Sequence, residues 1–354
     1  MSDLLIGLDV GTTATKALLL DMEGHVVASA TRGYGLITGP GQGWVEQDAE
    51  ELWQAVVETL RAVTSRCGPG QRIVAVSQSS EGGTTIPVDA GGRPTYHALS
   101  WMDQWAVQEL TEVSREAGAE SIRQTTGWPL GPGLPRLHIR WLKQHCPAEF
   151  AATHRFLFVN DFIGQRLTGQ PCMDPLNTSI THSMVLATGD WDARLLGFAG
   201  IRRDRLSPLQ PSGTVIGSLH RAASEATSLP IGTLAINGAH DQYCAAVATG
   251  VTMPGRLLLS CGTAWLTLAV APDLPTGLRS GLVISRHAVA GCWEAIVSLG
   301  AVGTFLEWLA DSVWDGRATD ERTALYQSLD EEAAHSQPGA AGLLFFLLAD
   351  TNHG

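Results

Sequence analysis

Residues 8–13, Leu8-Asp9-Val10-Gly11-Thr12-Thr13, form one of two similar stretches in this chain of 354 residues. The second stretch is Leu259-Ser260-Cys261-Gly262-Thr263-Ala264. Each lies between two apolar segments, which predicts a strand, a Gly-Thr turn and a returning strand. Such a turn presents backbone N–H groups and hydroxyls to an anion. Two such hairpins on two domains would hold one phosphate chain from both sides.

The composition is that of an ordinary globular chain, and its length suggests two domains. The net charge of −12 argues against nucleic acid or an anionic membrane as the main partner. The six cysteines are scattered without a C-x-x-C pair, so neither a zinc site nor a disulfide framework is expected. We find neither a signal peptide nor an apolar run of the ~18 residues that a membrane span needs. These features predict a cytoplasmic protein, and a homodimer stays open.

The first third of the chain predicts β-hairpins followed by a helix. Strands are expected over residues 4–10, 15–21, 25–32, 73–77 and 84–88. Asp48 is expected to cap a helix over residues 49–65. The apolar residues that share one face of this helix are Leu52, Val56, Leu60 and Val63.

The remainder of the chain mixes helices, strands and loops. Residues 127–135 contain three prolines and three glycines, which predicts a loop. Strands are expected over residues 156–159, running into a helix capped by Asn160-Asp161, and over residues 234–237. Helices are expected over residues 241–249 and 320–336. We place the domain boundary in the first of these two helices, giving domain one residues 1–244 and domain two residues 245–354.

Two carboxylates stand at predicted strand ends. Asp241 directly follows a strand and opens a helix, where the backbone points a side chain into a cleft. An aspartate at a helix start is more commonly an N-cap, and that alternative stays open on spacing alone. Asp9 ends an apolar strand immediately before the first Gly-Thr turn. Such a strand rarely ends in a carboxylate without a partner, although a turn-forming role is the simpler alternative.

Five segments of the chain resemble the FGGY carbohydrate kinases, in the order and spacing of that family. They are residues 6–16, 43–48 with the helix that follows, 100–103, 238–242 and 260–263. The resemblance covers nearly the whole chain. It implies an α/β chain with the actin-like/ribonuclease-H-like ATPase fold, in which two domains close on ATP. There is no G-x-x-x-x-G-K-[ST] motif, so a Walker-type ATP site is excluded.

The resemblance implies an ATP-dependent kinase of a small sugar or polyol, with a ketose such as xylulose favoured. By this resemblance Asp241 accepts the proton of the sugar hydroxyl, and Asp9 lies near the Mg²⁺ that accompanies ATP. For Lys16, a solvent-facing strand lysine is an equally good alternative to a phosphate contact. The residues expected to contact ATP are Gly11, Thr12, Thr13, Lys16, Gly262 and Thr263.

The expected sugar contacts combine an aromatic wall with polar groups, which suits the apolar face and the hydroxyls of a polyol. Trp101 and Asp103 match the family's Trp-x-Asp segment, and core packing is the alternative for Trp101. Gln242 stands next to the expected base. The full set of expected sugar-contacting residues is Glu81, Gly82, Gly83, Trp101, Asp103 and Gln242.

The first sugar-contacting loop departs from the family pattern. Glu81 stands where the family usually has Gln, and Gly82 and Gly83 stand at its specificity positions. Glycerol kinases place an Arg-Glu pair there and xylulose kinases a Met-His pair. The two glycines therefore predict a wider pocket at this point. Trp105 also replaces an Arg that is common in the family.

The C-terminal residues 347–354 no longer resemble the family. The family's second signature and its Gly-Gly-Gly adenosine-binding loop are absent from this sequence, so the second domain is expected to be incomplete. A truncated, non-catalytic sugar-binding remnant is therefore the alternative to an active kinase. A nucleotide-driven binding protein like actin or Hsp70 is disfavoured, because residues 101–103 and 240–242 match the sugar kinases.

Overall fold

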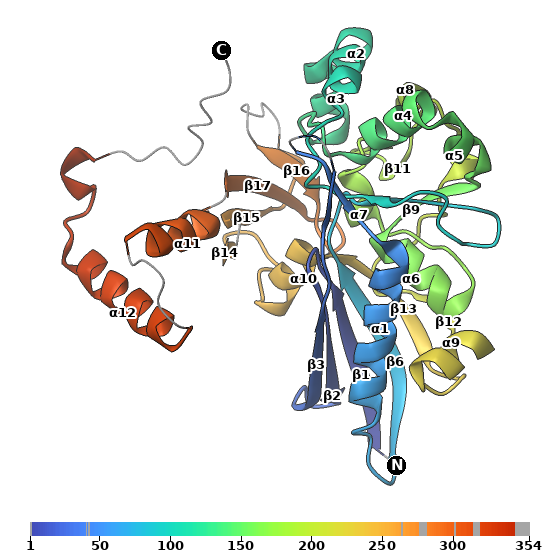
Figure 1. The fold of residues 1–354 in the computed structure, drawn as a ribbon, viewed down its shortest axis with the longest axis horizontal. Helices are drawn as coiled ribbons and strands as arrows, with labels where there is room; N and C mark the ends of the chain where they lie inside the picture. Colours follow the sequence, from blue (N-terminus) through green and yellow to red (C-terminus); the bar gives the residue numbers. More distant parts are fainter. Residues whose placement is uncertain are drawn as a thin grey trace.

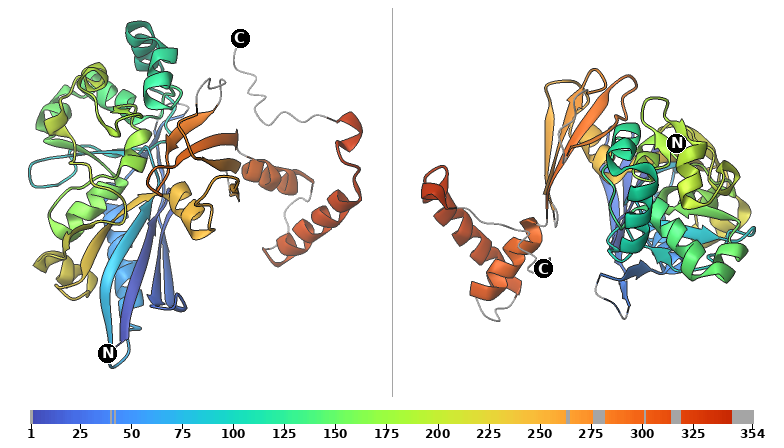
Figure 2. Two further views of the ribbon diagram at one scale, coloured as in Figure 1. Left: turned by 180° about the vertical axis from the view of Figure 1, so that it is seen from behind. Right: turned by 90° about the horizontal axis from the view of Figure 1, so that it is seen from above.

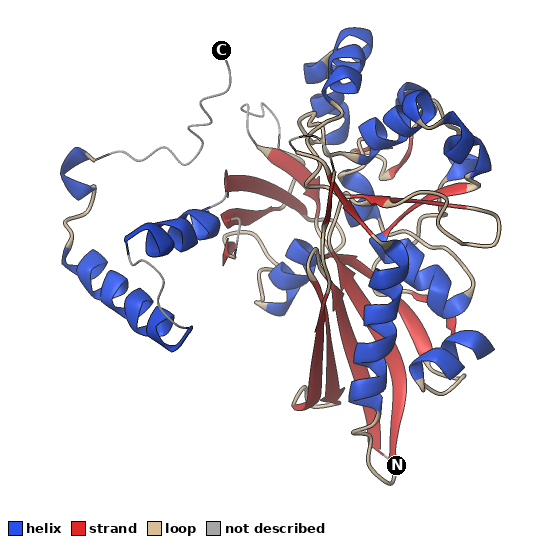
Figure 3. Ribbon diagram, viewed as in Figure 1, coloured by secondary structure: helices blue, strands red, loops and turns tan. Residues whose placement is uncertain are grey.

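A six-stranded sheet forms the centre of the first part of the chain in the computed structural model (Figure 1). The structure describes residues 2–39, 41, 43–262, 265–275, 282–300, 302–313 and 319–343. Strands and helices alternate through these residues, as Figure 3 shows, which confirms the expected α/β class. Among the described helices, none combines the length and the apolar character that a membrane crossing requires.

The six-stranded sheet has the order β12-β13-β6-β1-β2-β3. Its strands are β1 (Ser2–Val10), β2 (Ala14–Asp21), β3 (Val26–Gly33), β6 (Gln71–Ser80), β12 (Val215–Ser218) and β13 (Leu234–His240). β1, β2 and β3 form the predicted antiparallel hairpins. β6 lies parallel to both β1 and β13, so the carboxyl ends of these three strands meet at one edge of the sheet.

Helix α1 (Ala49–Thr64) packs on this sheet and confirms the predicted helix. The Asp48 side chain accepts hydrogen bonds from the backbone N–H groups of Glu50 and Glu51, which confirms the predicted cap. The predicted apolar stripe of α1 is buried in one core with alternate residues of β1, such as Ile6 and Leu8. Each such fully buried aliphatic side chain stabilises the fold by about 1.5–3 kcal/mol.

Helices α6 (Val159–Thr168) and α9 (Arg221–Thr227) pack on the same core. The predicted cap at Asn160-Asp161 was wrong in position, because α6 already begins at Val159. Asp161 nevertheless satisfies the helix start from inside the first turn, where its Oδ1 accepts the N–H of Phe158 at 2.5 Å.

A five-stranded sheet of order β4-β5-β8-β7-β9 follows in the first part of the chain. Its strands are β4 (Ile37–Thr38), β5 (Val45–Gln47), β7 (Thr85–Val88), β8 (Ala98–Leu99) and β9 (Arg155–Phe158). The remaining elements of this part are α2 (Val107–Ala117), α3 (Ala119–Thr126), α4 (Pro135–His145), α5 (Pro147–Ala152), α7 (Pro175–Ser179), α8 (Ala193–Ala199), the ribbon β10–β11 (Met184–Val185 and Asp190–Trp191) and a short turn at Arg203–Arg205. The predicted loop at residues 127–135 ends where α4 begins.

A four-stranded antiparallel sheet follows α10 (Asp241–Ala248). Its order is β14-β15-β17-β16, with bounds Leu257–Cys261, Trp265–Ala271, Trp293–Gly300 and Val283–Arg286. Figure 2 shows α11 (Val302–Val313) and α12 (Thr319–His335) on the side of this sheet that faces away from the six-stranded sheet. The last described element is a short turn at Ala340–Gly342. The expected domain boundary after residue 244 falls within α10 and stays a prediction.

Strand β16 docks the four-stranded sheet on the first part of the chain. The N–H of Ile284 donates to the carbonyl of Gly127 at 2.8 Å, and the Ser285 and Ser179 hydroxyls lie 3.1 Å apart. Gly127 has φ +82°, and a Cβ there would overlap the Ile284 carbonyl oxygen. Only glycine therefore permits this close approach.

Candidate active site

Three carboxylates gather at the edge where β1, β6 and β13 end. Asp9 lies in register with Ser79 of β6, and Ser79 lies in register with Ala239 of β13. Glu81 directly follows β6 and Asp241 directly follows β13. The charge of Asp241 contributes to raising the pKa of both Asp9 and Glu81, which places the three carboxylates in one electrostatic site. Parallel pairing thus unites residues that are far apart in the sequence.

Asp241 occupies the position that the sequence predicts, at the start of α10. His240 is the N-cap residue of this helix, so the N-cap alternative for Asp241 was wrong. Oδ1 of Asp241 accepts the N–H of Gln242 at 2.6 Å and lies 3.2 Å from Nδ1 of His240. Among the described residues, no side chain or backbone group is hydrogen-bonded to Oδ2. One oxygen of Asp241 is therefore held in place, and the other is left for a ligand.

A glycine in β13 brings Asp241 to this edge. A Cβ on Gly238 would overlap the backbone carbonyl of Gln78 in β6. The pairing of β13 with β6 is irregular between Ile236 and Ala239, at the same point. The missing side chain lets the two backbones approach closely just before the residues that carry the site.

Asp9 is partly exposed, and both of its carboxylate oxygens have polar neighbours. Ser79 Oγ donates to Oδ1 of Asp9 at 3.1 Å, and Nζ of Lys16 lies 3.9 Å from Oδ2. Burial raises the pKa of Asp9, and the Ser79 bond opposes that rise. The described residues contain no group of three His, Cys, Asp or Glu side chains arranged to hold a metal ion. Mg²⁺ needs only one or two carboxylates when phosphates and water complete its shell, so Asp9 fits it.

The first Gly-Thr turn is fixed by side chains from three other segments. The turn closes with the N–H of Gly11 donating to the carbonyl of Ala14 at 3.1 Å. The Tyr34 hydroxyl donates to the carbonyl of Gly11, and Nε2 of Gln47 donates to that of Thr12 at 2.9 Å. Nε1 of Trp101 donates to the Thr12 hydroxyl at 3.0 Å. The structure therefore places the expected sugar wall against the expected phosphate turn.

Trp101 is 40% exposed, so the core-packing alternative for this side chain was wrong. The Lys16 side chain is 61% exposed, and its Nζ lies 3.9 Å from Oδ2 of Asp9. The second hairpin is present as the antiparallel pair β14–β15, with Cys261 opposite Trp265. Gly262 is exposed in its turn, and Thr263 lies outside the described residues.

Glu81 is buried beneath the first turn. Burial raises its pKa to about 7, while the polar side chains of Thr12, Thr84 and Gln47 act in the opposite direction. A carboxyl group with this pKa carries a proton for much of the neutral pH range, so it can donate as well as accept a hydrogen bond.

The prediction of a wider pocket at Gly82 and Gly83 was wrong. A Cβ on Gly82 would overlap the imidazole ring of His240, and a Cβ on Gly83, which has φ +89°, would lie 3.0 Å from Cβ of Trp101. The two glycines thus bring the loop against neighbouring rings instead of opening space. Sequence reasoning missed His240 as the group that fills this position, because only the fold brings it beside Gly82.

The Asp103 carboxylate is bonded within the loop that carries Trp101 and to β5. It is completely buried, and its carboxylate accepts the N–H groups of Trp105 at 2.9 Å and Val45 at 3.2 Å. Burial raises its pKa to about 6. The expected direct contact of Asp103 with a sugar is therefore not available in this structure. Gln242 is half-buried, and its Oε1 has no partner among the described residues.

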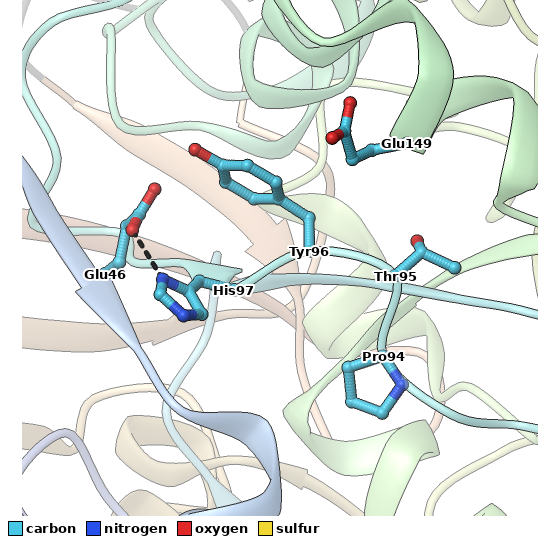
Figure 4. Close-up of a pocket in the computed structure, with 6 residues that line it drawn as sticks. All are labelled: Glu46, Pro94, Thr95, Tyr96, His97 and Glu149. Atoms are coloured by element: carbon cyan, nitrogen blue, oxygen red, sulfur yellow. Dashed lines mark hydrogen bonds and ion pairs between the residues drawn. The ribbon is translucent and has the colours of Figure 1, made fainter.

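A separate pocket of ≈ 480 Å³ lies at β5, away from these carboxylates. Figure 4 shows its lining residues, which are Glu46, Pro94, Thr95, Tyr96, His97 and Glu149. Oε2 of Glu46 pairs with Nδ1 of His97 at 2.9 Å. None of the residues that the sequence predicts for the active site lines this pocket, so it is not the predicted site.

Comparison with known proteins identifies the family of the chain. Residues 4–248 match the model of the N-terminal domain of the FGGY family of carbohydrate kinases. An autoinducer-2 kinase from Salmonella choleraesuis is 27% identical over 349 residues, and a gluconokinase from Bacillus subtilis is 26% identical over 348. These matches cover 96% and 98% of this chain. The chain spans 65% of the autoinducer-2 kinase and 67% of the gluconokinase.

Solved structures of carbohydrate kinases are also similar to this chain. The crystal structure of a xylulose kinase from Rhodospirillum rubrum matches with a TM-score of 0.88 at 28% identity, covering 96% of this chain and 69% of the other. A Plasmodium falciparum glycerol kinase with ADP matches with a TM-score of 0.81, covering 88% of this chain and 64% of the other. At 20% identity this second likeness concerns the fold alone. The matches confirm the actin-like fold expected from the sequence.

Proposed function

Because the chain belongs to the FGGY family of carbohydrate kinases, we propose that it transfers a phosphoryl group from ATP to a hydroxyl of a small sugar or polyol. One observation carries this proposal: Asp9, Glu81 and Asp241 converge beside a Gly-Thr turn that is already braced by Trp101. Phosphoryl transfer depends on positioning, on neutralised phosphate charge and on a base for the attacking hydroxyl.

Asp241 acts as the general base in this proposal. The N–H of Gln242 and the ring of His240 orient its Oδ1. The remaining oxygen can accept the proton of a sugar hydroxyl as that hydroxyl attacks the phosphorus atom. A positioned base of this kind contributes roughly 10²- to 10⁴-fold to the rate.

The first turn and Asp9 serve the phosphates. Gly11 closes the turn, the backbone N–H groups of Thr12 and Thr13 offer donors to phosphate oxygens, and Lys16 lies beside Asp9. Asp9 would hold Mg²⁺ directly or through water, and the bound ion would neutralise charge on the phosphates. In the second part of the chain, Gly262 and Thr263 would contact the phosphates from the opposite side.

Trp101 supplies an apolar wall for the sugar, and Gln242 supplies a side-chain amide. The carboxylates of Asp9 and Asp241 at this edge repel an anionic substrate, so the site favours a neutral ketose such as xylulose over a sugar acid such as gluconate. Asp103 acts indirectly by holding the Trp101 loop.

The test is an assay of ADP release with a panel of ketoses, polyols and gluconate, using purified protein and Asp241→Ala alongside. We expect release that depends on a neutral sugar and that Asp241→Ala abolishes. Asp204→Asn is the matched control, because Asp204 is exposed and forms an ion pair with Arg202, which has no part in the proposed site. Failure to bind ATP at millimolar concentration would rule out kinase activity for this chain.

The alternative is a sugar-binding remnant without catalytic activity. Calorimetric binding of a neutral sugar, with no ADP release under the same conditions, would support the remnant over the kinase.

A further inference from the structure

The pocket beside β5 is lined by two glutamates, and neither lysine nor arginine is among the described residues that line it. Its volume of ≈ 480 Å³ suits a small molecule. Glu46 enters the pocket from β5, Tyr96 and His97 from the segment that leads into β8, and Glu149 from α5, as Figure 4 shows. An anion would meet like charges in this pocket, so the pocket favours a cation.

The Glu46 carboxylate is buried in the wall of the pocket and is only partly satisfied. Its side chain is 4% exposed, and its Oε2 lies 2.9 Å from Nδ1 of His97. Its Oε1 is also buried, and this oxygen has no hydrogen-bond partner among the described residues. Figure 4 shows this second oxygen turned away from His97, on the side of the Tyr96 hydroxyl. A buried carboxylate oxygen without a donor is unfavourable, so Glu46 leaves an acceptor open for a ligand.

Glu149 supplies a second carboxylate to the same pocket. It is half-buried, and its carboxylate takes part in no ion pair or hydrogen bond within the part of the chain that the structure describes. Protonation of His97 would neutralise Glu46 but would not reach this second charge. The pocket therefore stays negative in either charge state of His97.

The remaining lining residues favour an organic cation over a bare metal ion. The described residues contain no group of three His, Cys, Asp or Glu side chains that could hold a metal ion. Pro94 and the ring of Tyr96 offer apolar surface, and an aromatic ring attracts a cation placed over its face. Burial raises the pKa of Tyr96, and the charge of Glu46 acts in the same direction, so the hydroxyl stays protonated.

We propose that this pocket binds a small organic cation that carries a primary ammonium group. The ammonium offers three N–H donors, which match Oε1 of Glu46, the hydroxyl oxygen of Tyr96 and the Glu149 carboxylate. The carbon chain of the ligand would lie against Pro94 and the Tyr96 ring. A quaternary ammonium ion has no N–H donor, so it would leave Glu46 unsatisfied and should bind less tightly.

This ammonium site is separate from the proposed kinase site. Glu46 and Gln47 are neighbours in β5, so their side chains leave opposite faces of the strand. Nε2 of Gln47 donates to the carbonyl of Thr12 in the first Gly-Thr turn at 2.9 Å. The pocket and the phosphate turn therefore lie on opposite faces of β5, and the ammonium site does not rest on kinase activity.

The test is calorimetric titration of the full chain with n-butylammonium chloride, with potassium chloride at equal ionic strength as the blank. We expect saturable binding in the millimolar range, and roughly tenfold weaker binding of tetramethylammonium chloride. Glu149→Gln and Glu46→Gln should each weaken n-butylammonium binding roughly tenfold, because each removes a charged acceptor. Glu225→Gln is the matched control, since it removes one negative charge from the exposed face of α9 and should leave the affinity unchanged.

Two further arms locate the site and its ligand. Unchanged binding to Asp241→Ala supports a site apart from the sugar site, whereas loss of binding there would overturn the proposal. Binding of Nα-acetyl-lysine amide that Glu149→Gln also weakens supports the same site occupied by a lysine side chain, and binding of n-butylammonium alone supports a free amine.

The proposal is overturned if n-butylammonium gives no saturable heat, or if it binds Glu149→Gln and the natural protein equally well. Glu149 is half-buried and lies in the short helix α5, so its substitution decides the test if Glu46→Gln does not fold. No ATP or sugar is present in the titration. Failure of the ammonium site and failure of the proposed function are therefore distinguished.

Discussion

The two Gly-Thr hairpins begin from similar sequences and end in different surroundings. The first, between β1 and β2, is braced by Tyr34, Gln47 and Trp101 and lies at the edge where three carboxylates meet. The second, between β14 and β15, belongs to the smaller four-stranded sheet. Its strand residues Leu257 and Leu259 are 58% and 49% exposed.

This difference separates what local sequence determines from what the rest of the chain adds. An apolar strand, a Gly-Thr turn and a second strand suffice to form the hairpin in both places. The chemistry comes from the long-range partners, since a phosphate turn without a neighbouring base or sugar wall binds but does not catalyse. Substitutions in the two hairpins and at their contacts test this difference.

The strongest change removes the close approach that brings Asp241 to the first hairpin. Gly238→Ala should destabilise the protein by about 3 kcal/mol or more, because its Cβ overlaps the Gln78 carbonyl and the backbone cannot yield cheaply. Sugar-dependent ADP release should fall with it. Gly232→Ala is the control, since a Cβ there meets nothing within 4 Å. Equal denaturation midpoints for the two variants would contradict this account.

Truncation of one leucine in each hairpin should also lower the free energy of unfolding by different amounts. Leu8→Ala, in β1, should cost about 2–5 kcal/mol, because Leu8 is buried in the main core. Leu259→Ala, in β14, should cost less than about 1 kcal/mol, because half of its side chain is already exposed. Urea denaturation measures both. Similar losses would show that β14 is packed as firmly as β1.

Ionisation of Glu81 should make the free energy of unfolding of the protein depend on pH. Its pKa is about 7 in the folded protein and near 4.5 when unfolded, so between these values the folded state binds the extra proton. Stability therefore falls as pH rises from about 4.5 to 7, by up to roughly 3 kcal/mol. Glu81→Gln should remove this part of the slope, whereas Glu23→Gln, at an exposed turn, should leave it. An unchanged slope in Glu81→Gln would show that Glu81 ionises normally.

Much of this organisation could be predicted from local pattern. Alternating apolar residues identify β1 and β2, and Asp48 with its apolar stripe identifies α1, because these signals depend on neighbours in sequence. The position of Asp241 at a strand end was likewise predictable, since strand-to-helix junctions recur at parallel sheet edges. The structure confirms each of these elements.

The errors lie where distant segments meet. Gly82 predicts open space, yet the ring of His240 occupies it. Asp103 is a residue type that commonly contacts ligands, yet its carboxylate is buried and accepts two backbone N–H groups. No local pattern reveals that Gly238 must touch Gln78. Each outcome depends on which segments the fold brings together, and that information is spread over the whole chain.

The smallest effect on catalysis is expected at Trp101, whose indole N–H donates to the Thr12 hydroxyl of the first Gly-Thr turn. Trp101→Ala removes the indole N–H that donates to the Thr12 hydroxyl and the apolar wall expected to face the sugar. The loss of one hydrogen bond and one aromatic contact should lower kcat/KM for the sugar roughly tenfold. Trp101→Phe restores an aromatic surface without the indole N–H, so it should recover only the part of kcat/KM that depends on the apolar contact. No change in either variant would remove Trp101 from the site.

We propose that Asp241 acts as the base for phosphoryl transfer to a sugar. The most direct test is ³¹P NMR of the reaction mixture at saturating ATP, Mg²⁺ and xylulose, with natural protein and with Asp241→Asn. We predict a sugar-phosphate resonance for the natural protein and a rate lower by roughly 10²- to 10⁴-fold for Asp241→Asn, with ATP binding unchanged. Equal rates of sugar phosphorylation in the two proteins would contradict the claim.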